Sequence, residues 1–191
     1  MILLLAVVIG LTATLVRARI KNRTLKYIRL RWEWLIFVAV LPQVLVIQAP
    51  WVGQWIPVIF IPPIQMISMT GLLIFSTANF MAPGFWALMS GLTGNFLVMI
   101  LNGGWMPISQ ETLLRLYPAQ PVERWVIGTR LGLTKDWILP ITNTNLAWLS
   151  DCLILPQWFP YKVAFSFGDI FISIGAVILL WSLSSKVEEK E

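Results

Sequence analysis

Two aspartates carry the side chains best suited to chemistry in this otherwise apolar sequence. Asp169 ends a Phe-Ser-Phe-Gly-Asp motif that begins at Phe165, directly before the uncharged apolar run 170–181. Asp151 stands among apolar neighbours in the preceding segment. Two carboxylates that share one site can activate a water molecule, because their proximity separates their pKa values. The two aspartates are therefore candidate catalytic residues if the fold brings them together.

Each aspartate also has a structural interpretation. Ser166 lies three residues before Asp169, and this spacing predicts a capping box at the first turn of a helix. Asp151 can equally be a solvated carboxylate in a loop. Both interpretations stay open at this point, because the spacing of the two residues does not show whether they meet in space.

Further residues define the ends of the apolar runs beside these carboxylates: Asn95, Asn102, Gly103, Gly104, Pro107, Ser166 and Gly168. An Asn-Gly-Gly-Trp-Met-Pro motif closes the run 85–101, and its glycines favour a helix C-cap and a chain reversal. Asn102 would lie at the same membrane face as Asp169 and could point into a shared site. Asn95 lies within the run, where a buried amide needs a hydrogen-bond partner.

The composition indicates a membrane protein. Hydrophobic residues make up 58% of the 191 residues and charged residues only 12%, whereas a soluble domain has roughly 45–50% and 25%. The chain has no histidine and a single cysteine, Cys152. These counts exclude an internal disulfide and a multi-cysteine metal site, and they remove the usual haem ligand and general base. We therefore expect no cofactor and no metal.

Five apolar segments predict an all-α integral membrane bundle that forms a single domain over 1–191. The expected spans are 1–16, 32–48, 58–76, 85–101 and 166–183. Seven of the fourteen Lys/Arg fall between Arg17 and Arg31, and the positive-inside rule places them in the cytoplasm. We expect a bacterial inner-membrane protein with its N-terminus outside and its C-terminus, including Lys186 and Lys190, inside. The basic segment is expected to form a short helix on the anionic leaflet.

The segment 102–163 carries too many charges to cross a membrane and is rich in tryptophan. We expect an outer cap, helical over 110–117 and 121–131. Gly91 and Gly94 predict one close helix–helix contact face. The expected partners are the lipid bilayer and other membrane proteins; nothing indicates nucleic acid.

Several motifs in one order resemble a bacterial family of small multi-pass membrane proteins of unknown function. They are Arg29-Leu30-Arg31-Trp32, Gly91 to Asn95, Asn102 to Pro107, Leu149-Ser150-Asp151 with Pro156, and Phe165 to Asp169 with Gly175. The resemblance covers nearly the whole chain. It implies an integral membrane protein of unestablished activity.

A more local similarity is to lipoprotein signal peptidase, a membrane aspartyl protease. Its last span opens with Phe-Asn-x-Ala-Asp, which Phe165 to Asp169 resembles, and an earlier span ends near Gly-Asn-x-x-Asp. The stretch Gly94 to Val98 resembles the second motif, but Val98 replaces its aspartate. Two-carboxylate chemistry would then require Asp151 as the substitute.

Three functions follow from these observations. The first is a non-catalytic accessory or scaffold subunit of a membrane protein assembly. The second is an outer-leaflet aspartyl hydrolase that uses Asp151 and Asp169. The third is a small transporter or lipid-binding protein that uses the proline-broken third span. The separation of the two carboxylates, and whether a cleft opens between them, distinguishes the second from the others.

Overall fold

A computed structural model describes residues 2–185 and is mostly helical, as the sequence predicts. Met1 and residues 186–191 lie outside the described part, and with them Lys186 and Lys190. The α-helices are α1 (Ile2–Ile20), α2 (Glu33–Gln48), α3 (Pro50–Gly53), α4 (Ile61–Ala78), α5 (Phe85–Leu101), α6 (Gln110–Leu116) and α7 (Phe167–Ser182). Single turns of 3-10 helix are η1 (Val58–Phe60), η2 (Val122–Arg124), η3 (Ile141–Asn143) and η4 (Ala147–Leu149).

The five long helices coincide with the five expected apolar segments, and α5 has the expected bounds. By length and composition, α1 and the segment Val58–Ala78 could each cross a membrane. The helices α2, α5 and α7 are also apolar but shorter, with 16, 17 and 16 residues. Two candidate membrane helices therefore agree with a membrane protein, and the arrangement with five spans stays a prediction.

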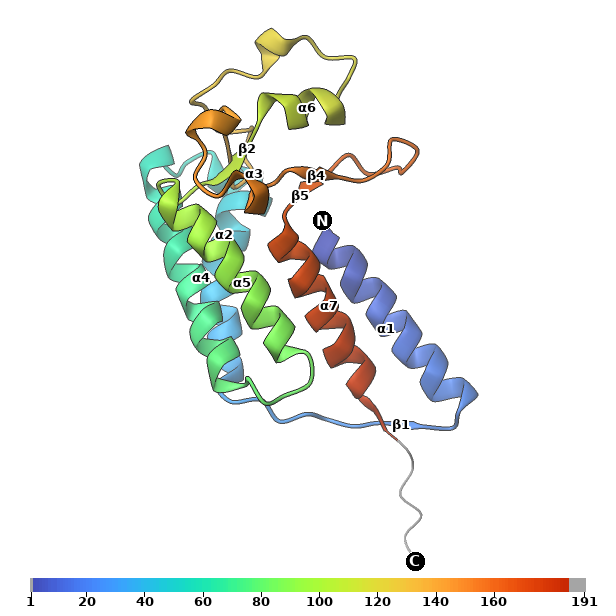
Figure 1. Cartoon of the computed structure of the whole chain (residues 1–191). Coiled ribbons are helices and arrows are strands. Elements are labelled where there is room, and N and C mark those ends of the chain that lie inside the picture. Colours follow the sequence, from blue (N-terminus) through green and yellow to red (C-terminus); the bar gives the residue numbers. More distant parts are fainter. Residues whose placement is uncertain (1, 186–191) are drawn as a thin grey trace, which may run out of the picture.

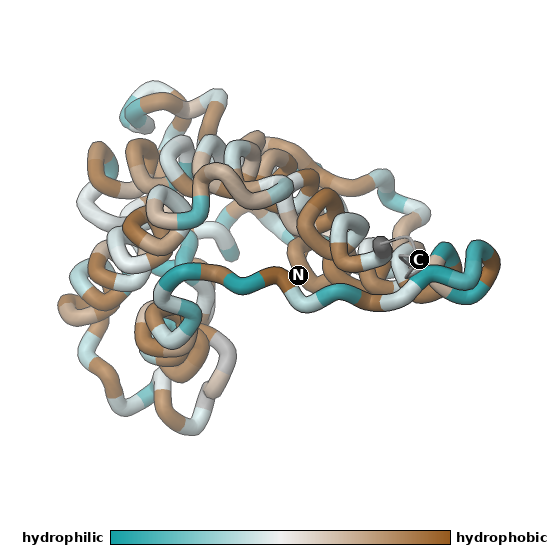
Figure 2. Tube along the Cα trace, turned by 90° about the horizontal axis from the view of Figure 1, so that it is seen from below, coloured by the Kyte–Doolittle hydropathy of each residue, from teal (hydrophilic) through white to brown (hydrophobic). Residues whose placement is uncertain are grey.

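The long helices pack side by side in the order α2, α4, α5, α7 and α1. In this order of contacts α1 and α2 come last and first, although they are consecutive in the chain; Figure 1 shows α2 behind α4 and α5, and α1 on the far side of α7. The segment between them therefore has to cross beneath the other helices. Figure 2 views the molecule from this side and shows hydrophobic residues along the helices and many hydrophilic residues in the connecting segments.

The basic segment 21–32 is extended, and the prediction of a helix there is wrong. We call it the inner strap, because the positive-inside rule predicts it on the cytoplasmic side of a membrane. Its strand β1 (Thr24–Leu25) pairs antiparallel with β6 (Ser184–Ser185), and the backbone of Arg31 exchanges two hydrogen bonds with the side chain of Asn79. The ends of α7 and α4 thus satisfy backbone groups that an isolated helix would have to pair internally.

The cap over 102–163 combines a helix with short strands, which corrects the all-α expectation. Helix α6 confirms the prediction for 110–117. The predicted helix over 121–131 is wrong, because Gly128 has a φ of 78° and its amide donates to Ile138 in a hairpin-like turn. Strands β2 (Met106–Ile108) and β3 (Asp136–Ile138) pair in parallel, and β4 (Leu153–Ile154) pairs antiparallel with β5 (Ala164–Phe165). These strands place the cap over the C-terminal end of α5 and the N-terminal end of α7 (Figure 1).

Candidate functional site

A buried polar network joins the start of α7 to the middle of α5. Ser166 caps α7 by accepting from the Asp169 amide at 3.0 Å, and Asp169 Oδ2 accepts from the Ser166 amide at 3.2 Å. This is the capping box that the sequence predicts. Asn95 completes the network, since its amide nitrogen donates to Asp169 Oδ1 at 2.9 Å and its oxygen accepts from the Ser166 hydroxyl at 2.8 Å. Both oxygens of Asp169 are therefore engaged in hydrogen bonds.

Glycines bring α5 and α7 close enough for this network to form. A Cβ added at Gly91 would collide with the carbonyl oxygen of Gly168, and one added at Gly168 would collide with the Asn95 side chain. Further along the pair, Gly84, directly before α5, and Gly175 on α7 approach each other in the same way. The two contacts are seven residues apart on each helix, about two helical turns. Gly91 is thus at the interface as predicted.

Gly94, the other glycine of the predicted contact face, is not at this interface. A Cβ added there would have no atom outside its own helix within 4 Å. A separation of three residues turns the helix by roughly 300°, which moves Gly94 away from the line through Gly84 and Gly91. The seven-residue spacing of Gly84 and Gly91, repeated by Gly168 and Gly175, is the signal that sequence reasoning missed.

Asp151 lies under the cap in a different set of contacts. Its carboxylate forms an ion pair with Lys135, with 3.1 Å between Nζ and Oδ2. Its amide donates to the carbonyl oxygen of Pro107, which is itself buried in β2. Asp151 is only 2% exposed, so it is not the solvated loop carboxylate of the simpler interpretation. No sequence pattern marked Lys135 as its partner, because the two residues are 16 positions apart, with β3, η3 and η4 between them.

Charges around Lys135 hold the cation in place. Burial by itself lowers the pKa of Lys135, but the carboxylates of Asp151, Asp169 and Asp136 raise it above its ordinary value on balance. Burial raises the pKa of Asp151 well above its usual range, and Lys135 opposes that shift. The negative charges of Asp136 and Asp169 add to the upward shift of the Asp151 pKa, so both act electrostatically on Asp151. Asp151 nevertheless pairs with Lys135, and Asp169 accepts from the Asn95 side chain and the Ser166 amide.

The side chain of Asn102 forms no hydrogen bond with Asp151 or Asp169. Its side chain donates to the carbonyl oxygen of Asn145 at 2.9 Å and accepts from the Asn145 amide at 2.9 Å. The Asn145 side chain in turn donates to the carbonyl oxygen of Leu101. These hydrogen bonds attach the cap to the end of α5. Asn102 therefore holds the cap and does not point into a site shared with Asp169.

The two glycines after Asn102 form the expected chain reversal. Gly103 and Gly104 have φ values of 72° and 85°, and the Gly104 amide donates to the carbonyl oxygen of Met99 at 2.7 Å. Gly104 also packs on Pro62, which a Cβ would meet at 2.6 Å. The motif therefore ends α5 and directs the chain into β2.

Three of the four carboxylate oxygens of Asp169 and Asp151 have a partner, and Oδ1 of Asp151 has none within the described chain. Asp169 is 9% exposed and has two donors, and Asp151 is 2% exposed and neutralised by Lys135. Among residues 2–185, His, Cys, Asp and Glu form no group of three or more that could hold a metal ion. One further amide, that of Gln65 on α4, is buried, and neither of its polar atoms has a partner within the described chain. The two aspartates thus belong to a buried polar region beneath the cap.

The fold and the site thus define a mostly helical protein whose apolar helices are joined by a polar network under a cap. A family model described as a family of unknown function (DUF5317) matches residues 27–181, well over half of the chain. The chain belongs to this family, which confirms the resemblance to a family of unknown function. No curated protein and no solved structure matches it significantly.

Proposed function

We propose that this chain is a five-span protein of the bacterial inner membrane that acts as a non-catalytic accessory or scaffold subunit. Its N-terminus would lie outside and its C-terminus in the cytoplasm. The inner strap would then face the cytoplasm, and the segment 102–163 would cap the outer face.

Exposed apolar side chains on all five long helices support the placement in a membrane. Examples with more than 40% exposure are Leu4 on α1, Phe37 on α2, Ile67 on α4, Ile100 on α5 and Phe171 on α7. Patches of this kind on every helix would aggregate in water, whereas lipid covers them without penalty. The shorter helices of 16–17 residues rise about 24–26 Å, close to the roughly 30 Å of a bilayer core.

The observation that carries the non-catalytic proposal is the engagement of both candidate aspartates. A dyad that activates water needs carboxylates that share a site open to solvent and substrate. Asp169 instead completes a capping box and receives the Asn95 amide, and Asp151 is neutralised by Lys135. These contacts favour the accessory role over the alternative of an aspartyl hydrolase.

Exposed aromatic side chains on the outer side supply a surface for a partner. Trp148 and Trp158 in the cap are 64% and 81% exposed, and Tyr161 is 53% exposed. Aromatic side chains are enriched both at protein interfaces and at the membrane surface. An accessory subunit would use such residues for contacts with a second membrane protein at the level of the headgroups.

Single-cysteine labelling tests the proposed orientation. In a Cys152→Ser background, Lys21→Cys in the inner strap and Glu123→Cys in the cap are each treated with a membrane-impermeant maleimide on intact spheroplasts. Both positions are exposed, so accessibility depends on the side of the membrane. Labelling of Glu123→Cys alone is expected; labelling of Lys21→Cys alone would overturn the orientation.

Extraction in native nanodiscs tests the accessory role. Expressed from its own chromosomal locus, the tagged protein is expected to migrate as an assembly with a second membrane protein at fixed stoichiometry. Trp158→Ala and Trp148→Ala should weaken that assembly while leaving the thermal unfolding midpoint unchanged. A lone monomer recovered from native membranes would overturn the proposal.

A further inference from the structure

The inner strap concentrates positive charge beside the end of α4. Five of the fourteen Lys/Arg of the chain lie in the strap, and Arg17 and Arg19 precede it at the end of α1. Within residues 2–185 the only ion pair is that of Lys135 with Asp151 in the cap, so no carboxylate of the described chain neutralises the strap. Basic clusters immediately beside membrane helices attract anionic lipids.

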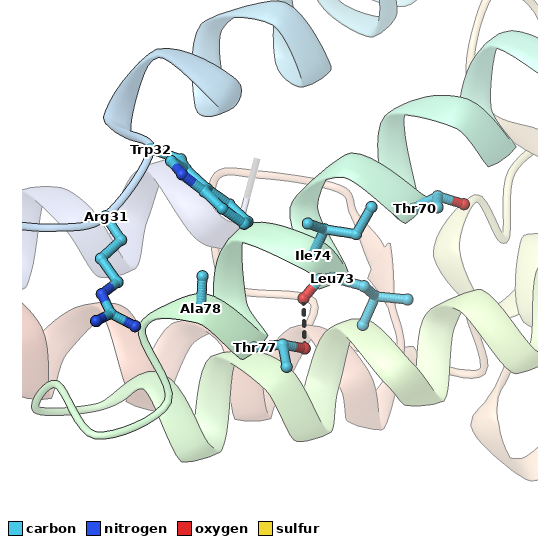
Figure 3. A pocket seen from close by; sticks show the side chains of 7 residues that line it. All are labelled: Arg31, Trp32, Thr70, Leu73, Ile74, Thr77 and Ala78. Atoms are coloured by element: carbon cyan, nitrogen blue, oxygen red, sulfur yellow. Dashed lines mark hydrogen bonds between the residues drawn. The ribbon is translucent and has the colours of Figure 1, made fainter.

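A groove of about 640 Å³ lies where the strap meets α4. Figure 3 shows that Arg31 and Trp32 come from the strap and that the remaining lining residues come from α4. Thr70, Ile74 and Ala78 follow one another at four-residue intervals, so they form one stripe of roughly 12 Å along the helix. Leu73 and Thr77 widen this stripe, and the Thr77 hydroxyl is occupied by the Leu73 carbonyl oxygen. The floor of the groove is therefore apolar, with a guanidinium at one end.

The backbone holds Arg31 and Trp32 at this position without using their side chains. The amide and carbonyl groups of Arg31 bond to Asn79 at 2.7 and 3.0 Å, so the guanidinium is not needed to anchor the strap. Trp32 has a φ of 56° and a ψ of 44°, a left-handed conformation that costs about 1–2 kcal/mol for a residue with a Cβ. This conformation leaves the indole 54% exposed beside Ile74 (Figure 3). Unfavourable backbone geometry of this kind concentrates at ligand sites.

A second recess of about 550 Å³ shares Trp32 with the groove as a lining residue. It is lined by Tyr27, Arg29, Leu30, Glu33 and Trp34 in addition to Trp32. Glu33 in this recess accepts from the Tyr27 hydroxyl and the Leu30 amide, and among the described residues it forms no ion pair with Arg29. Arg29 is thus a second exposed cation next to the groove.

We infer that this groove binds one anionic phospholipid, with its phosphate on Arg31 and an acyl chain along the Thr70–Ala78 stripe. Charge complementarity selects the headgroup, because an exposed guanidinium offers several donors to a phosphate. The apolar stripe selects a lipid over a soluble anion, and Trp32 suits the boundary between headgroup and chain. The inference rests on the membrane placement proposed above, but it does not require a partner protein.

Native mass spectrometry of the full-length protein in mild detergent tests this site. Phosphatidylglycerol and phosphatidylcholine with identical acyl chains are added separately, and the occupancy of the first bound lipid is compared. We expect about fivefold tighter retention of phosphatidylglycerol, the factor that corresponds to ~1 kcal/mol for one basic side chain at an anionic surface. Arg31→Gln should reduce the ratio to near one. The matched control Lys21→Gln removes a strap charge outside the groove and should keep the fivefold ratio.

The stripe is tested separately from the charge. Ala78→Phe fills the groove and should lower the occupancy of both lipids; Thr70→Phe does the same from an exposed position if the first variant unfolds. Equal retention of the two lipids by the wild type, or equal ratios in Arg31→Gln and Lys21→Gln, would overturn the inference. Displacement of phosphatidylglycerol by millimolar inorganic phosphate would show a site for anions only and would also overturn it. Because the measurement uses purified protein, its failure is distinguishable from failure of the accessory role.

Discussion

Replacing Asp169 by asparagine tests whether this carboxylate is structural. The carboxylate accepts from two donors, Asn95 Nδ2 at 2.9 Å and the Ser166 amide at 3.2 Å. An asparagine has one acceptor oxygen, so in either amide orientation one buried donor faces an NH₂ group. A lost hydrogen bond to a charged group contributes about 1.5–3 kcal/mol, and the lost charge at the helix N-terminus adds about 0.3–1 kcal/mol. We expect Asp169→Asn to reduce the free energy of unfolding by about 2–4 kcal/mol.

The double variant Asn95→Asp, Asp169→Asn should recover at least half of this loss. The aspartate at position 95 accepts from the Ser166 hydroxyl and from the new amide at position 169, and that amide's oxygen accepts from the Ser166 backbone. Every hydrogen bond of the network is thereby retained, while the carboxylate has moved from α7 to α5. A catalytic role of Asp169 would be lost in both variants alike.

Tryptophan fluorescence during unfolding in mixed micelles with increasing SDS measures these differences, since the chain has eleven tryptophans. Glu123→Gln is the matched control, because Glu123 is an exposed carboxylate in the cap and should change stability by less than about 0.5 kcal/mol. An Asp169→Asn variant as stable as the wild type would refute the reasoning. So would a double variant less stable than the single one.

Two further predictions concern the helix contact and the buried ion pair. Gly91→Ala should destabilise the fold by about 1–3 kcal/mol, since its Cβ meets the Gly168 carbonyl, whereas Gly94→Ala should be neutral or stabilising by up to about 1 kcal/mol; equal stabilities in SDS unfolding would contradict the contact. Lys135→Met should cost about 3 kcal/mol near pH 8, the lower end for a buried pair, because the lysine is 28% exposed. Burial already raises the Asp151 pKa, and removing the cation raises it further, so folding favours the protonated acid. The loss of stability relative to the wild type should then be smallest in acid. It should grow as the pH rises from the folded-state pKa of Asp151 in the wild type towards the higher pKa of Asp151 in the variant. A loss that is constant between about pH 5 and 9 would contradict the pairing.

Local patterns in the sequence predicted the helices and their ends. The apolar run 85–101 became α5 with the same bounds, because a segment of that length and composition satisfies its backbone groups only as a helix. The capping box at Ser166 and Asp169 was readable for the same reason, since its two residues lie one turn apart. The double glycine after Asn102 predicted the reversal that follows α5.

Contacts between residues far apart in the chain could not be predicted from the sequence. Asn95 was expected to need a partner, but its 74-residue separation from Asp169 left that partner open. The failed helix predictions over the inner strap and over 121–131 have the same cause, because backbone groups from other elements satisfy these segments. Local propensity is a weak guide wherever tertiary partners compete for the same donors and acceptors.

The sequence by itself determined the apolar helices, the position of the basic segment and the polar residues at the helix ends. Each of these depends on composition or on residues within one helical turn. Only the tertiary structure decided that Asp169 bonds to Asn95 and that Asp151 pairs with Lys135. The close approach of α5 and α7 at their glycines, and the route of β2 between Lys135 and Asp151, create these contacts. Such contacts depend on the packing of whole elements, which no local pattern encodes.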